Sequence, residues 1–149
     1  KKLLERRPLS YDSAPRQKLI DGDAHLSHSF NGDALQASHE KPEIGFVIPK
    51  EGATIWMDSM LIPTGAPAKD LAHAFIDYLC RPGVSAEITN WGNFGNPNEL
   101  AQQHIKKEIR ENPLVYPPED VLKRCFYLPA MSAGLRKEME DAWAEVRKK

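Results

Sequence analysis

The chain has 149 residues, of which 41% are hydrophobic and 28% are charged, and its net charge is −1 at pH 7. This composition is ordinary for a globular protein, and the small net charge excludes a strong general attraction to nucleic acid or to an anionic membrane. No apolar run approaches the roughly 20 residues that a membrane-spanning helix needs. We therefore expect one domain over residues 1–149 that buries about 68–70% of its unfolded surface.

Helices and strands alternate in the first half of the chain. A helix over residues 1–7 is stopped by Pro8, and Ser13 then caps a second helix that has Pro15 in its first turn. Alternation over residues 24–30 indicates one strand, and two later apolar runs that end at Pro49 and Pro63 indicate two more. The remaining predictions for this half are a helix end near Gly22, a strand over residues 24–30, a helix over 34–39, a strand over 44–48, a turn over 50–52 and a strand over 55–62.

Helices dominate the second half. The helix predicted over residues 68–81 places Leu71, Phe75, Tyr78 and Leu79 on one face, which we expect to be core. A Gly- and Asn-rich loop over 92–98 carries Phe94. Further helices are predicted over residues 84–91, 100–106, 118–124 and 130–147, the last packing back through Met139, Trp143 and Val146. Early strand–helix alternation followed by helices predicts an α/β class.

Trp56 and Asp58 form the most informative pair of side chains. In a strand, residues two apart share a face, so the indole and the carboxylate would point the same way, with Thr54 beside them. Such a pair binds a cation, because the ring face attracts an ammonium group and the carboxylate neutralises it. The alternative interpretation is that Trp56 belongs to the core and Asp58 caps a loop.

Metal, cofactor and enzyme signals are weak. The five histidines are scattered, and Cys80 and Cys125 lie outside any C-x-x-C spacing, so we expect no metal. We expect two unpaired, largely buried thiols, and a disulfide between them in an oxidising compartment is the alternative. Asp33 and Asp58 resemble an acid/base pair, but no nucleophile or metal ligand accompanies them. We therefore expect no cofactor, no catalytic residue and no enzymatic activity.

Several short strings, taken together, resemble the periplasmic polyamine-binding proteins, which are the solute receptors of spermidine/putrescine ABC importers. Their order and spacing match this family from about Ser13 to Val146. The strings are the turn Phe30–Ala34, the segment Ile48–Ala53 followed by Trp56–Ser59, the helix end Leu79–Pro82, and the two stretches Lys107–Pro113 and Tyr116–Val121.

The resemblance implies a two-lobed periplasmic-binding-protein fold of type II, with ligand held between the lobes. Family members are roughly twice this long, so the chain is expected to be the C-terminal half: part of the second lobe and the segment returning to the first, with the N-terminal half absent. Asp58 matches the acidic residue that grips an ammonium group, and Trp56 the aromatic residue beside it. Asp33 matches a second acidic position found in putrescine-type members.

Three other positions complete the implied ligand site. Phe30 stands where the family usually has Trp, and Phe94 where it usually has Tyr, while Ser13 or Asp12 matches a polar contact. The two phenylalanines keep an apolar wall but lose polar groups.

The implied function is a periplasmic receptor that delivers putrescine or spermidine to an ABC permease in the inner membrane. No nucleic-acid partner and no membrane insertion are expected. Because of Phe30 and Phe94, another cationic or small organic solute stays open as the ligand. An enzyme or sensor on the same scaffold is the alternative function, since a fold does not fix a function.

Overall fold

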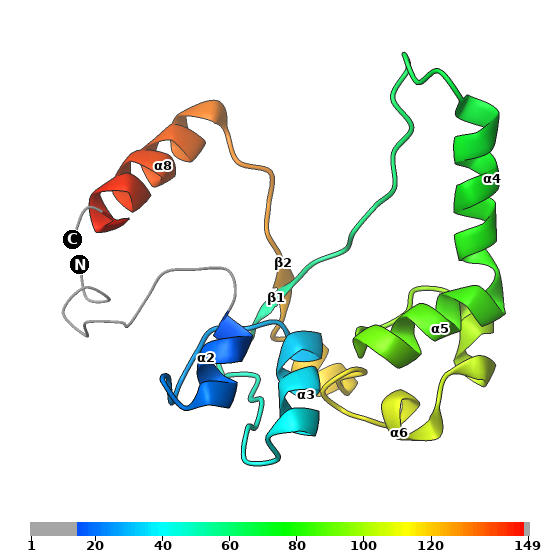
Figure 1. Ribbon diagram of the computed structural model, residues 1–149. Coiled ribbons are helices and arrows are strands. Elements are labelled where there is room, and N and C mark those ends of the chain that lie inside the picture. Colours follow the sequence, from blue (N-terminus) through cyan, green and yellow to red (C-terminus); the bar gives the residue numbers. More distant parts are fainter. Residues whose placement is uncertain (1–14, 148–149) are drawn as a thin grey trace.

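The structure is a computed structural model that describes residues 15–147. The described chain is mainly helical, with two very short strands (Figure 1). The predicted helix over residues 1–7 and the predicted contact residue Ser13 lie outside the described residues. The elements are α2 (Pro15–Asp21), α3 (Asn31–Glu40), β1 (Thr54–Ile55), α4 (Lys69–Cys80), α5 (Pro82–Gly92), the 3₁₀ helix η1 (Glu99–His104), α6 (Lys107–Arg110), α7 (Glu119–Leu122), β2 (Phe126–Tyr127) and α8 (Ala133–Arg147).

A small apolar core holds the centre of the molecule together. It lies where α5 packs against η1, and Leu35 of α3 packs on it from the side. Its buried members are Ala86, Ala101, Ile105, Ile109 and Val115. Next to this core, α2 is fixed on α3 by polar contacts: Arg16 donates to Gln36 Oε1 over 3.0 Å and forms an ion pair with Glu40. The core therefore positions α3 and α5 relative to each other.

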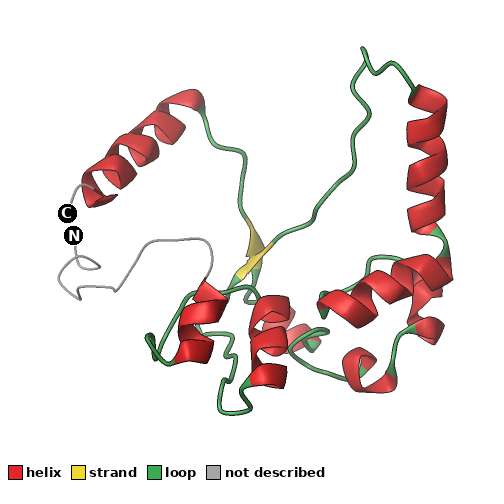
Figure 2. Cartoon of the chain, in the orientation of Figure 1, coloured by secondary structure: helices red, strands yellow, loops and turns green. Residues whose placement is uncertain are grey.

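The two strands pair in parallel and join distant parts of the chain. Thr54 of β1 lies opposite Phe126 of β2, whose N–H donates to Ala53 O over 3.1 Å. Arg124 reinforces the pairing, because its Nη1 donates to Lys50 O over 3.0 Å. Figure 2 shows the strands where the segments leading to α4 and α8 diverge. The pairing thus fixes the segment around β1 to the segment around β2.

The strand predictions were mostly wrong. Residues 24–30 and 44–48 form no strand, and of the run 55–62 only the first residue belongs to β1. Alternation of side chains indicates an extended backbone, but a strand also needs a partner backbone to accept and donate its hydrogen bonds. Within residues 15–147 only β1 and β2 supply such partners. The turn over 50–52 is confirmed, with Gly52 N donating to Pro49 O over 3.0 Å.

The helix predictions were largely right in position. Each helix predicted within residues 15–147 is present, with bounds shifted by a few residues and with the shortest ones reduced to single turns. Sequence patterns missed α6 and β2. These elements are four and two residues long, too short to generate a recognisable period.

The predicted burial of two helix faces was wrong. On α4, Leu71 is 71% exposed and Phe75 is 58% exposed, and on α8 both Met139 and Trp143 are exposed. Both helices project from the centre of the molecule (Figure 1), and within residues 15–147 no further layer of helix or strand packs over the α4 face. The chain consequently exposes 11955 Å², whereas a folded monomer of this mass exposes about 7,600 Å². The expectation that the chain buries about 68–70% of its unfolded surface was therefore wrong as well.

Both cysteines are free, as expected, but their predicted burial was only partly right. Cys125 is half-buried, whereas Cys80 is exposed at the end of α4. Cys80 is the last residue of α4 and lies nine positions after Leu71, so it is on the opposite side of the helix from the predicted core face.

The parallel pairing depends on Gly52, which gives a test of the fold. Gly52 has a φ of +97°, and a Cβ there would collide with Arg124 O. We expect Gly52→Ala to lower the free energy of unfolding by about 1–3 kcal/mol, because a non-glycine residue is strained in this conformation. Urea unfolding measures this change, and hydrogen exchange at the Phe126 amide reports the loss of pairing.

Gly45→Ala is the matched control, since a Cβ at Gly45 meets nothing within 4 Å. We expect it to change stability by no more than about 0.5 kcal/mol. Equal effects of the two substitutions would contradict the role given to Gly52.

Candidate functional site

Three aromatic residues from distant parts of the sequence meet in one cluster. The rings of Phe30 and Trp56 have centroids 5.2 Å apart at an interplanar angle of 66°, and those of Trp56 and Phe94 lie 5.4 Å apart at 72°. Both contacts are edge-to-face, the arrangement that the ring quadrupoles favour. The structure thus brings together three of the residues that the sequence nominated for ligand binding.

Each ring is placed by the end of a secondary-structure element. Phe30 is the N-cap residue of α3, and Trp56 follows directly after β1. Phe94 comes two residues after α5 ends, beyond Asn93, which takes the left-handed conformation with φ 58°. Because α3 and α5 pack on one core and β1 is paired with β2, the cluster is fixed by the fold rather than by local sequence.

Close approach of α3 to Phe94 requires a glycine. A Cβ at Gly32 would lie 2.5 Å from Phe94 Cζ and 2.7 Å from Gly92 O, distances at which a neighbour must shift. In the sequence, Gly32 stands out only as part of the turn Phe30–Ala34, which resembles the polyamine-binding family. The requirement comes from contact with a residue more than sixty positions away, so no local signal revealed it.

Two side-chain hydrogen bonds tie α3 to the segments around Phe94. Asn31 Nδ2 donates to Leu114 O over 2.9 Å, and Gln36 Nε2 donates to Gly92 O over 3.1 Å. These bonds hold the start and the middle of α3 against neighbouring backbone. They therefore stabilise the position of Phe30 relative to Phe94.

The aromatic cluster keeps an accessible face. Trp56 is 43% exposed and Phe30 is 51% exposed, while Phe94 is half-buried. A core residue would be almost fully covered, so the interpretation of Trp56 as a core residue does not fit this chain. The cluster is an aromatic surface that a flat or apolar group can contact.

Two carboxylates belong to the same chain segments as the rings. Asp33 is half-buried in the first turn of α3, where a negative charge also interacts favourably with the helix dipole. Asp58 is exposed two residues after Trp56. Since β1 ends at Ile55, the strand that was predicted to put Trp56 and Asp58 on one face is not formed.

The described chain gives no evidence for a metal site or for a membrane-spanning helix. No group of three or more His, Cys, Asp or Glu residues among residues 15–147 could hold a metal ion. No helix in this range is both long and apolar enough to cross a membrane.

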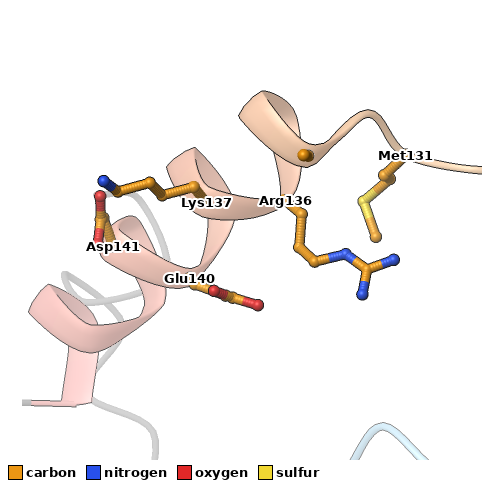
Figure 3. A pocket seen from close by; sticks show the side chains of 6 residues that line it. Met131, Arg136, Lys137, Glu140 and Asp141 are labelled. Atoms are coloured by element: carbon orange, nitrogen blue, oxygen red, sulfur yellow. The ribbon is translucent and has the colours of Figure 1, made fainter.

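A hollow of about 570 Å³ lies beside α8, and the described residues that line it come from one side only. Its lining comes from α8 and the segment just before it, as Figure 3 shows, with side chains leaving the helix on different sides. The lining residues are Met131, Ala133, Arg136, Lys137, Glu140 and Asp141. Without an opposing wall this surface does not enclose a ligand.

Comparison with known proteins places the chain in a family. Residues 5–117 match the model of the bacterial extracellular solute-binding proteins. The chain is 36% identical over 135 residues to the putrescine-binding periplasmic protein PotF of Escherichia coli and 31% identical over 135 residues to the putrescine-binding periplasmic protein SpuD of Pseudomonas aeruginosa. Each match covers 87% of this chain, but only 36% and 37% of the two relatives.

Comparison with solved structures gives the same result for the fold. The spermidine/putrescine ABC transporter substrate-binding protein PotD of Streptococcus pneumoniae matches with a TM-score of 0.74 and 21% identity, over 89% of this chain and 41% of that protein. Because the family model matches residues 5–117, the chain belongs to the bacterial extracellular solute-binding proteins. The predicted periplasmic-binding-protein fold, present as a part, is confirmed.

The close contact at Gly32 allows a direct test of the cluster. In a chain whose only tryptophan is Trp56, made by Trp91→Phe and Trp143→Phe, we expect Gly32→Ala to shift the fluorescence emission to longer wavelength. The added methyl displaces the Phe94 ring, and Trp56 then becomes more accessible to water.

Gly83→Ala is the control, because Gly83 is also helical and a Cβ there meets nothing within 4 Å. It should leave the emission unchanged and raise stability by about 0.4–1 kcal/mol. An unchanged spectrum for Gly32→Ala would show that Phe94 does not depend on this glycine.

Proposed function

We propose that this chain forms part of a periplasmic receptor that binds putrescine or a related polyamine and delivers it to an ABC permease. The aromatic cluster of Phe30, Trp56 and Phe94 supports the proposal most directly. Asp33 and Asp58 lie on the segments that supply two of these rings. In this proposal the rings contact the ligand's carbon chain and the carboxylates receive its ammonium groups.

The chemistry of a polyamine matches these groups. Its methylene chain gains about 0.8 kcal/mol for each CH₂ that is buried against apolar surface. An ammonium group gains up to about 2 kcal/mol over an aromatic face when water is excluded. A carboxylate in a closing cleft is costly to desolvate unless a cation pairs with it, which discriminates against uncharged solutes.

The relatives support the same ligand class. Those compared are named for binding putrescine or spermidine, and they are binding proteins rather than enzymes. Because the chain spans little more than a third of their length, the complete cleft, the permease and the periplasmic location are part of the proposal. We infer a binding role without bond-making chemistry.

A different small cationic or organic solute is the second candidate. It is favoured by Phe30 and Phe94, whose rings carry no hydroxyl or indole N–H to orient a polar ligand. A competition series of putrescine, spermidine, lysine and thiamine distinguishes these ligands.

Substitution of one carboxylate tests the proposed role of charge. We expect Asp58→Asn to weaken putrescine binding far more than Ser59→Ala, because the amide keeps the size of the carboxylate and removes its charge. The next residue, Ser59, is also exposed, so its substitution controls for local disturbance. Isothermal titration calorimetry with putrescine gives both affinities, and equal values would rule out Asp58 as an ammonium ligand.

A further inference from the structure

We propose that Asn96 is a positioning residue that holds Phe94 against Trp56 and thereby sets the shape of the aromatic wall. Asn96 is not a member of the aromatic cluster, and the family resemblance assigned it no role. The part of this inference that concerns ligand affinity rests on the proposed polyamine function. The part that concerns the ring arrangement does not.

The side-chain amide of Asn96 uses all of its hydrogen-bonding capacity. Oδ1 accepts from Ser85 Oγ over 3.0 Å and from Asn98 N–H over 2.8 Å. Nδ2 donates to Ser85 O over 2.8 Å and to Thr89 Oγ1 over 3.1 Å. An amide carries two donors and one acceptor oxygen with two lone pairs, so every partner position is filled. The amide thus joins the Phe94 loop to two successive turns of α5.

The backbone around Phe94 is fixed on both sides. Before the ring, Asn93 N–H donates to Thr89 O over 2.9 Å and closes the end of α5. After the ring, Asn96 N–H donates to Tyr116 Oη over 3.1 Å. Tyr116 is itself held, because Gln102 Nε2 donates to the same oxygen over 3.2 Å. Phe94 therefore lies between two anchored points with little freedom to move.

Loss of these hydrogen bonds is costly, because two of the residues involved are buried. Thr89 is only 3% exposed and Asn93 is 6% exposed, so neither readily exchanges a lost partner for water. Removal of the Asn96 amide leaves the Thr89 hydroxyl without this donor and removes the side-chain bonds from the loop to α5, so that the Asn93 N–H bond to Thr89 O is left to hold it. The loop then relaxes, and the Phe94 ring moves away from the indole.

Fluorescence of the chain with Trp56 as its only tryptophan tests the position of the ring without any ligand. We expect Asn96→Ala to shift the emission to longer wavelength and to increase quenching by acrylamide. Asn90→Ala is the matched control, because Asn90 lies on α5 itself and its side-chain amide makes two hydrogen bonds away from Phe94: Nδ2 donates to His104 O over 3.3 Å, and Oδ1 accepts from Lys106 N–H over 2.9 Å. It should lower stability but leave the emission unchanged.

The two asparagine variants separate positioning from a purely structural role. A shift for Asn96→Ala alone supports the proposal, and equal spectra for both variants overturn it. If Asn96→Ala fails to fold, as judged by circular dichroism, Ser85→Ala replaces it, because this change removes the hydroxyl that donates to Asn96 Oδ1. A shift in the same direction then supports the proposal, and an unchanged spectrum overturns it.

Calorimetry with putrescine tests the consequence for binding. We expect Asn96→Ala to weaken binding by about tenfold, because a displaced Phe94 ring deprives the ligand of about one cation–π interaction, and Asn90→Ala to leave affinity unchanged. Equal affinities of Asn96→Ala and the parent would overturn this consequence. If the parent chain does not bind putrescine, the proposed function fails, while the fluorescence result still decides the positioning role.

Discussion

The edge-to-face packing of Trp56 between Phe30 and Phe94 is the interaction on which the candidate site depends. It joins the start of α3, the end of β1 and the loop after α5, which are brought together by a small core and by one parallel strand pair. The contact is possible because position 32 carries no side chain and Phe94 occupies that space. A few buried contacts therefore build a surface that local sequence does not specify.

The sequence predicted which aromatic residues form this surface, but not how they are arranged. Phe30, Trp56 and Phe94 were nominated by family resemblance, and the structure places them together. Their arrangement was not predictable, because it rests on the space left at Gly32, which the distant Phe94 fills, and on hydrogen bonds that join Asn96 to α5 only in the folded chain. Ser13 lies outside the described residues, and the roles of Asp33 and Asp58 as ligands of an ammonium group stay predictions.

Helices were predictable and strands were not, for one physical reason. A helix satisfies its backbone within its own segment, so the apolar period of residues 68–81 was enough to locate α4. A strand is completed by another segment, so the run 55–62 predicted extended chain but not the pairing that ends at Ile55. The same limit applies to burial: the pattern on α4 identified its apolar face, but Leu71 and Phe75 are exposed, because within residues 15–147 no element packs over them.

The central claim is that this aromatic surface receives a cationic amine. Titration of the chain whose only tryptophan is Trp56 with putrescine, and separately with butane-1,4-diol, tests it most directly. The two compounds have the same carbon chain and differ in their charged ends. We expect a saturable change in Trp56 emission with putrescine and none with the diol. Equal responses to both compounds, or no response to putrescine, would contradict it.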